Sequence, residues 1–205
     1  MWKIIGTGIT QAFNQRTIFR KLSFEIKSGE SLVLVGPNGS GKTTLIRIVC
    51  NLLHPIEGKV EFYYGNQTKM AGQLYSSIGM VGPYLQLYNN LTAFENYAFF
   101  RKIRGLNVDH GHFKILMKKF GLAGREFDEL RTYSSGMLQR MKYVCALLHS
   151  PPILILDEPV SNLDESGERI IYDVMEEQKR SNILIFATNN PEEIKFGDKK
   201  IRLAV

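Results

Sequence analysis

Short apolar runs alternate along the chain with segments whose apolar residues recur at helical spacing. This alternation favours an α/β fold in which helices pack on a parallel or mixed sheet. Strands are predicted at residues 18–26, 31–35, 60–64, 78–81, 153–156, 183–187 and 200–203.

The middle of the chain has a different pattern. Residues 92–100 and 112–120 carry apolar side chains at helical spacing, with Gly105 and Asn107 between them. We expect an inserted helical lobe over approximately residues 86–150. The sequence shows no internal repeat, low-complexity stretch or linker rich in proline and serine, so the lobe is predicted to belong to a single domain over residues 1–205.

Composition narrows the class of protein. The chain has 205 residues and is 44% hydrophobic, which suffices for a substantial core, yet no apolar run approaches the roughly 20 residues that span a bilayer. The N-terminal residues lack the apolar stretch of a secretory signal, which indicates a cytoplasmic protein. The net charge of +6 comes from scattered basic residues, so it is weak evidence for a nucleic-acid or membrane partner, and no nucleic acid is expected.

A glycine-rich loop carries the clearest chemical signal. It follows the apolar run 31–35, leads into the helix-like segment 45–50 and has the spacing G-x-x-x-x-G-K-[ST]. Glycines at this spacing let backbone N–H groups surround a polyphosphate, and the start of the following helix adds further N–H groups. We expect Lys42 to contact the β and γ phosphates and the hydroxyl of Thr43 to bind Mg²⁺. The expected nucleotide-binding residues are Gly36, Pro37, Asn38, Gly39, Ser40, Gly41, Lys42, Thr43 and Thr44.

Two adjacent carboxylates, Asp157 and Glu158, follow the apolar run 153–156. At the end of such a strand they are expected to face the phosphate loop on the neighbouring strand. Asp157 is the expected Mg²⁺ ligand, through the metal's water shell, because a hard cation prefers oxygen ligands. Glu158 is expected to accept a proton from the attacking water, or at least to orient it. An acidic turn that caps the next helix is the structural alternative.

A second anion site is indicated at Ser134, Ser135 and Gly136, which precede a helical segment ending at His149. A helix N-terminus offers unpaired N–H groups and a favourable dipole to a phosphate. A second such helix end makes sense where it meets the nucleotide of another copy of the chain. An ordinary serine cap explains these residues equally well.

Taken together, these motifs resemble those of ABC-type ATPases, the nucleotide-binding subunits of ABC transporters. The phosphate loop, the run S-S-G-M-L-Q-R at 134–140, the run I-L-I-L-D-E-P at 153–159 and residues 161–164 occur in that family's order and spacing. The resemblance covers almost the whole chain. It implies a P-loop NTPase core with a mixed sheet, an antiparallel β portion near the N-terminus and the inserted helical lobe.

The resemblance also implies cofactors and partners. ATP and Mg²⁺ are the expected cofactors, and two copies, or one copy and a homologous subunit, would enclose two ATP molecules head to tail. Each ATP would contact the phosphate loop of one subunit and Ser134, Ser135 and Gly136 of the other, with Asp164 acting across the interface. Phe13 resembles the aromatic residue that stacks on adenine, and a core phenylalanine is the alternative. The lobe would dock on separately encoded membrane-spanning subunits, which places the protein at the inner face of the cell membrane.

Two positions depart from the family pattern. In the family, the strand that corresponds to residues 78–82 usually ends in a glutamine. Here Pro83 follows residue 82, and the nearest glutamine is Gln86. Gln86 either supplies a contact to Mg²⁺ and water from a longer loop or lies in a packing or docking segment. Asn189 stands where most relatives carry a histidine that contacts the γ-phosphate. Asparagine still donates a hydrogen bond but does not become cationic, so slower hydrolysis is expected.

The leading hypothesis is an ATPase that drives an ABC transporter by ATP-dependent dimerisation, because the phosphate loop and both carboxylates are retained. A non-catalytic, nucleotide-gated dimerisation module is the alternative that Pro83 and Asn189 favour, and a soluble ATPase of DNA repair or translation is a third. The sequence stops just after the last predicted strand, so no C-terminal regulatory domain is expected. The runs 90–96 and 133–137 are similar to those of the short ATP-binding subunits of heme exporters used in cytochrome c maturation.

Overall fold

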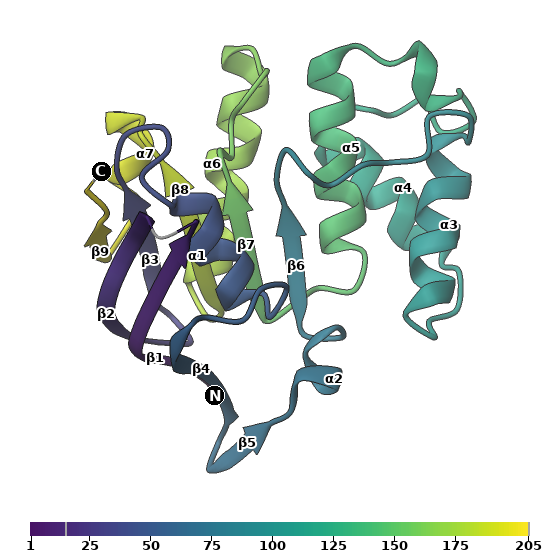
Figure 1. Cartoon of the computed structure of the whole chain (residues 1–205). Coiled ribbons are helices and arrows are strands. Elements are labelled where there is room, and N and C mark those ends of the chain that lie inside the picture. The colour runs from purple at the N-terminus through teal and green to yellow at the C-terminus, as the bar shows by residue number, and fades with distance from the viewer. Residues whose placement is uncertain (15, 205) are drawn as a thin grey trace.

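The computed structural model describes residues 1–14 and 16–204 (Figure 1). The strands are β1 (Trp2–Phe13), β2 (Arg16–Lys27), β3 (Ser31–Val35), β4 (Glu57–Tyr64), β5 (Gln67–Lys69), β6 (Ile78–Val81), β7 (Ile153–Asp157), β8 (Ile183–Thr188) and β9 (Lys199–Arg202). The helices are α1 (Lys42–Val49), α2 (Ala71–Leu74), α3 (Ala93–Ile103), α4 (His110–Lys119), α5 (Ser135–Leu147), α6 (Glu165–Lys179) and α7 (Pro191–Ile194), with a 3₁₀ turn at Leu130–Thr132.

The strands form two sheets. Strands β6-β7-β8-β3-β9, in that order, make a parallel sheet, and β2-β1-β4-β5 make an antiparallel sheet. Figure 1 shows the carboxyl ends of β3, β7 and β8 on the same side of the parallel sheet, which we call its carboxyl end. The prediction of an α/β fold with an antiparallel portion near the N-terminus is confirmed, with the two kinds of strand pairing in separate sheets.

Strand β8 lies between β3 and β7. The expectation that the strand bearing Asp157 directly neighbours the phosphate-loop strand is therefore wrong. Backbone pairing places Val35 of β3 beside Thr188 of β8, and Ala187 of β8 beside Asp157 of β7. Helix α1 bridges the gap, because it starts just after β3 and contacts both β8 and β7. Local sequence does not record this order, which depends on where each crossover connection returns the chain to the sheet.

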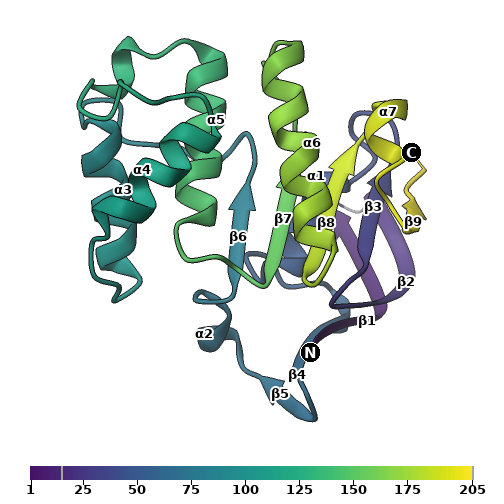
Figure 2. The same ribbon diagram turned by 180° about the vertical axis from the view of Figure 1, so that it is seen from behind.

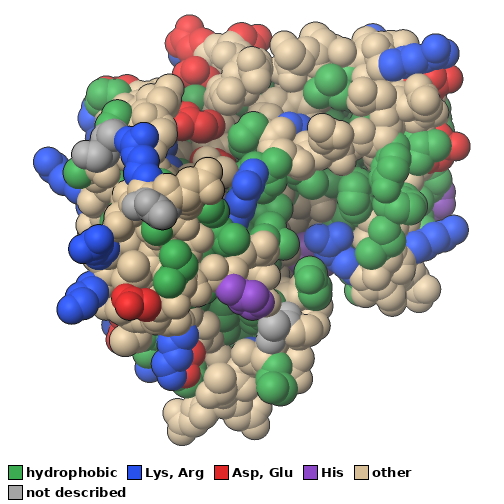
Figure 3. All heavy atoms as spheres, in the orientation of Figure 1, with side chains coloured by type: hydrophobic (Ala, Val, Ile, Leu, Met, Phe, Trp, Pro, Cys, Tyr) green, Lys and Arg blue, Asp and Glu red, His purple; other side chains and the backbone are tan. Residues whose placement is uncertain are grey.

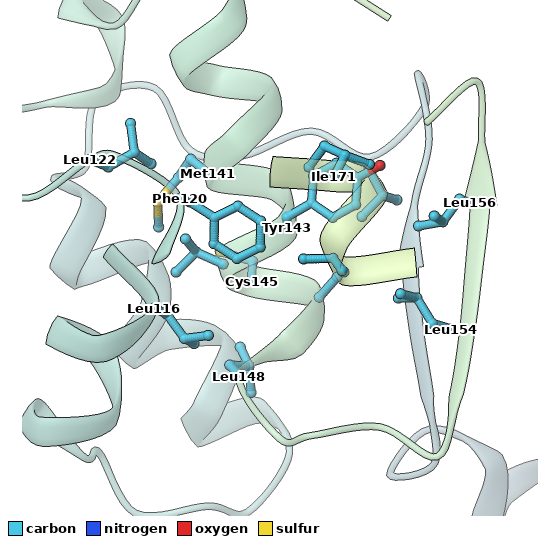
Figure 4. Close-up of a cluster of buried hydrophobic side chains, with 14 of the residues drawn as sticks. Leu116, Phe120, Leu122, Met141, Tyr143, Cys145, Leu148, Leu154, Leu156 and Ile171 are labelled. Carbon is cyan, nitrogen blue, oxygen red and sulfur yellow. The ribbon is translucent and has the colours of Figure 1, made fainter. Parts of the chain in front are cut away.

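The parallel strands are buried on both faces, which explains their continuous apolar sequences. On β7, Ile153 and Ile155 pack in one core cluster with residues of α1 and the antiparallel sheet. Leu154 and Leu156 point to the other face and pack in the cluster that includes residues of α5 and α6. Figure 4 shows this second cluster, with Tyr143 of α5 between the helices and the sheet.

Strands β1 and β5 lie outside the predicted strands. Gly6 and Gly8 interrupt the apolar pattern of β1, and the pairing register with β2 shifts between Gly6 and Ile9. Strand β5 consists of three polar residues. Neither segment has a periodic apolar signal. Strand β1 pairs with β2 and β4, and β5 pairs with β4, so it is this pairing that makes them strands.

Helices α3, α4 and α5 lie beside β6, at the edge of the parallel sheet opposite β9 (Figures 1 and 2). Their N-caps are Thr92, Asp109 and Ser134, and each side chain accepts from a backbone N–H three residues later. One cluster of buried apolar residues runs from these helices into the parallel sheet. Within residues 1–14 and 16–204, no helix has both the length and the apolarity needed to cross a membrane.

Candidate functional site

The loop between β3 and α1 has a backbone that glycine accommodates and other residues do not. Gly39 and Gly41 have φ angles of 81° and 96°, and a Cβ atom on Gly41 would lie 2.3 Å from Cγ2 of Ile18. At Gly36, a Cβ atom would lie 2.4 Å from the carbonyl oxygen of Leu203. The glycines therefore permit a tight loop, and α1 starts directly after Gly41 with no side chain capping its N–H groups. This arrangement leaves the helix start open to an anion, as the motif predicts.

Lys42 points back into this loop. Its ammonium group donates to the carbonyl oxygens of Gly36 at 2.7 Å and Pro37 at 3.3 Å, and it lies 3.9 Å from Oε1 of Glu158. The residue is 6% exposed. An ammonium group held in this way can exchange loop carbonyls for phosphate oxygens with little movement.

Thr43, in the first turn of α1, contacts Asp157 even though β3, the strand before α1, does not neighbour β7. The hydroxyl of Thr43 donates to Oδ2 of Asp157 at 2.7 Å. Burial raises the pKa of Asp157, while the hydrogen bond from Thr43 and the charges of Lys42 and Arg47 oppose that rise. The hydroxyl and the carboxylate that the sequence assigns to metal binding therefore lie together.

This pair fits a magnesium ion. The second carboxylate oxygen of Asp157, Oδ1, is buried and has no hydrogen-bond partner among the described residues. Leaving such an oxygen unsatisfied is costly, and a hard divalent cation or its bound water would satisfy it. In the described part of the chain, no cluster of three or more His, Cys, Asp or Glu residues offers a metal site made by protein ligands alone. A metal bound here would thus depend on phosphate and water oxygens for its remaining ligands.

Glu158 follows β7 with an unusual backbone. Its φ angle is 55°, in the left-handed region, and its N–H donates to the carbonyl oxygen of Ala187 at 3.0 Å. The side chain lines a cavity of about 310 Å³ together with Asn38, Lys42 and Thr43. Burial raises the pKa of Glu158, the charge of Asp157 adds to the rise, and Lys42 opposes it. A carboxylate with raised proton affinity therefore faces the space beside the phosphate loop.

Three other predicted residues are not among those that line the cavity beside the phosphate loop. Asn189 is exposed, and its amide nitrogen donates to Oδ1 of Asn38 in the phosphate loop at 3.4 Å. Phe13 is 46% exposed at the end of β1, so it is not a core residue. Gln86 is exposed in the segment between β6 and α3. There it is Tyr84 that packs on α1, with its ring 5.0 Å from the guanidinium of Arg47.

Ser134 and Ser135 are exposed at the start of α5. The Ser134 hydroxyl accepts from the N–H of Met137 at 3.2 Å, so within one chain this serine caps the N-terminus of α5. Figure 1 shows this end of α5 and the phosphate loop on the same side of the molecule, with β7 and α6 between them. The structure therefore does not bring these serines together with the phosphate loop of the same chain.

Asp164 is the N-cap of α6. Its Oδ1 accepts from the N–H of Gly167 at 2.8 Å and from the hydroxyl of Ser166 at 3.0 Å. These hydrogen bonds, the one from Gly167 first, lower the pKa of Asp164. The loop before it touches α5, since a Cβ atom on Gly136 would lie 3.2 Å from the carbonyl oxygen of Asn162.

Glu193 is a carboxylate near the site that sequence analysis missed. It is 3% exposed, and its Oε2 has no hydrogen-bond partner in the described residues. Burial raises its pKa, a hydrogen bond with Thr188 opposes the rise, and the charge of Glu158 adds to it. A glutamate in the first turn of a short helix is normally exposed, so the sequence carries no signal of its burial.

Basic side chains are dispersed over the face shown in Figure 3, which has the orientation of Figure 1. On the described part of that face they form no continuous stripe.

The fold and the phosphate loop define a nucleotide-binding domain. The chain belongs to the ABC transporter family, because the family model described as ABC transporter matches residues 19–161. The linearmycin resistance ATP-binding protein LnrL of Bacillus subtilis (strain 168) is 35% identical over 92% of this chain and 61% of that protein. The cytochrome c biogenesis ATP-binding export protein CcmA of Aliivibrio fischeri is 30% identical over 95% of this chain and 96% of that protein. The family predicted from the motifs is confirmed.

The fold is shared with a solved structure described as "Structure of ATP binding subunit of ABC transporter". The TM-score is 0.82, with coverage of 98% of this chain and 85% of that chain at 24% identity. The chain spans 51% to 61% of the length of five curated relatives, whereas it covers nearly all of CcmA.

Proposed function

We propose that this chain binds and hydrolyses ATP and thereby powers an ABC transporter. The observation that carries the proposal is that four side chains lie close together at the carboxyl end of the parallel sheet. Thr43 lies 2.7 Å from Asp157, and Lys42 lies 3.9 Å from Glu158. Membership of the ABC transporter family supports this reaction class.

Each of these residues has a separate task in the proposed reaction. Lys42 and the N–H groups of the loop bind the triphosphate, and Thr43 and Asp157 hold Mg²⁺, directly and through water. When bound, Mg²⁺ neutralises charge that develops on the β and γ phosphates. Glu158 orients the attacking water and accepts its proton, a task that its raised pKa favours. Asn189 donates a hydrogen bond toward the γ-phosphate in place of a cationic group.

A second copy, or a homologous subunit, completes each site in this proposal. The exposed Ser134 and Ser135, with Gly136, would contact the ATP held by the other subunit's phosphate loop. Their separation from the loop of their own chain supports this arrangement. Phe13 would stack on the adenine, and Asp164 would act across the interface.

Two further parts of the proposal concern contacts outside the phosphate loop. Gln86 would reach the water shell of Mg²⁺ from its exposed segment.

The helical lobe of the single domain, formed by α3, α4 and α5, would dock on membrane-spanning subunits and hold the protein at the inner face of the membrane. The names of the relatives include linearmycin resistance, bacitracin transport and cytochrome c biogenesis. The proposal therefore extends to the class of transporter and not to a substrate.

Steady-state ATP hydrolysis by the purified chain tests the proposal. Turnover is measured over a range of protein concentrations, with Mg²⁺ and with EDTA, beside Lys42→Ala and Glu158→Gln. We expect turnover that rises more than linearly with protein concentration, requires Mg²⁺ and is lost in both variants. Lys114→Ala, at an exposed lysine of α4, is the matched control and is expected to keep wild-type turnover.

The opposite result would favour the non-catalytic dimerisation module. In that case the wild type binds ATP in equilibrium dialysis, yet its turnover is no faster than that of Glu158→Gln. Loss of ATP binding as well would contradict both functions.

A further inference from the structure

The carbonyl oxygen of Pro159, directly after Glu158, is bound by α5. It accepts a hydrogen bond from the hydroxyl of Tyr143 at 2.8 Å and a longer one from Nε2 of Gln139 at 3.5 Å. Both donors are buried, and Tyr143 is 0% exposed. Proline has no N–H group, so this carbonyl is the only backbone group through which Pro159 forms hydrogen bonds.

The turn that α5 holds is strained. Glu158 has a φ angle of 55°, which a non-glycine residue keeps only where surrounding contacts enforce it. On one side, the N–H of Glu158 donates to the carbonyl oxygen of Ala187 in β8. On the other side, the hydroxyl of Tyr143 binds the next residue. The backbone around Glu158 is thus held by two elements, α5, which precedes β7, and β8, the neighbouring strand of the sheet.

The hydroxyl of Tyr143 is not needed to fill space. The ring lies in the apolar cluster of Figure 4 and stacks on Phe120 at 5.8 Å between centroids. A phenylalanine would make the same apolar contacts without burying an oxygen atom, which is costly unless that oxygen is hydrogen-bonded. A tyrosine hydroxyl is protonated, and so a donor, at neutral pH even at its ordinary pKa, and burial raises the pKa of Tyr143 well above that value.

We infer that Tyr143 is a positioning residue: its hydroxyl, by binding the Pro159 carbonyl, sets the direction in which the Glu158 carboxylate faces the phosphate loop. The same bond connects the turn that carries this carboxylate to α5, whose N-cap Ser134 and first residue Ser135 are proposed to contact a second nucleotide. This inference rests on the proposed function, in which Glu158 acts on the attacking water.

Tyr143→Phe removes only the hydroxyl, and Tyr97→Phe is its matched control. Tyr97 is also 0% exposed, and its hydroxyl donates to a backbone carbonyl, that of Asp109, at 3.1 Å, within the α3–α4 region. We expect kcat for ATP hydrolysis to fall about tenfold in Tyr143→Phe, because small displacements of a catalytic group cost much of its effect. KM for ATP should stay near the wild-type value, since the phosphate loop is untouched. Tyr97→Phe should keep both constants.

Hydrogen exchange at the Glu158 amide gives a second readout that needs no turnover. Exchange should be faster in Tyr143→Phe than in the wild type and unchanged in Tyr97→Phe. The inference is overturned if kcat falls equally in both variants, or if the Glu158 amide exchanges at the wild-type rate in Tyr143→Phe. If the wild type itself shows no turnover, the proposed function fails, and the exchange rates alone decide whether Tyr143 holds this turn.

Discussion

Replacing Glu158 by glycine and by alanine separates the cost of its backbone from the loss of its carboxylate. Both variants lack the carboxylate and its 3.9 Å contact with Lys42, so their difference reports the φ angle of 55°. Alanine must keep that left-handed conformation, whereas glycine adopts it freely. We therefore expect the glycine variant to be the more stable of the two, and both to lack ATP hydrolysis.

The expected difference in free energy of unfolding is small but measurable. The left-handed conformation costs a non-glycine residue about 1–2 kcal/mol. Glycine loses about 0.5–1 kcal/mol more conformational entropy on folding than alanine, which offsets part of this. The net advantage of glycine is roughly 0.5–1 kcal/mol, or about 1–4 °C in Tm for a chain of this size.

Thermal unfolding followed by circular dichroism, without nucleotide, is the assay. Glycine and alanine variants of Asp173, an exposed residue of α6, are the control, and their difference in stability is expected to have the opposite sign. There glycine should be less stable than alanine by about 1 kcal/mol, because the backbone is helical. An alanine variant at 158 that is as stable as the glycine variant, with the control behaving as expected, would refute the argument from backbone strain.

Two further predictions concern the phosphate loop and the buried carboxylate. Gly41→Ala should destabilise the protein by about 2 kcal/mol and weaken ATP binding, because the φ of 96° and the 2.3 Å approach to Ile18 leave no room for a side chain. An unchanged urea midpoint would contradict this. Glu193→Gln should stabilise the protein at pH 7, because a carboxyl whose folded pKa is raised costs stability once pH exceeds its unfolded pKa. The gain in Tm should fade as pH falls toward the ordinary value of about 4.5, and a gain that is the same at pH 5 and pH 8 would count against the burial argument.

Sequence patterns sufficed for the strands that are buried on both faces. Strands β3, β7 and β8 were predictable because the sheet buries both of their faces, so nearly every residue is apolar. Strand β1 was not, because glycines and polar residues interrupt its pattern, and it is the pairing with β2 and β4 that makes it a strand. A strand that is defined by its partners leaves little trace in its own residues.

The phosphate loop was determined by sequence alone, because its glycines, Lys42 and Thr43 are contiguous and their backbone conformation follows from their own sterics. The sheet order that places β8 between β3 and β7 was decided only by the tertiary structure. The tertiary structure also decided three further features. These are the hydrogen bond between Thr43 and Asp157, the burial of Glu193 and the hydrogen bond from Tyr143 to Pro159. Each of these depends on packing between separate elements of the fold, and the free energy of such contacts is not encoded in the residue spacing of any one segment.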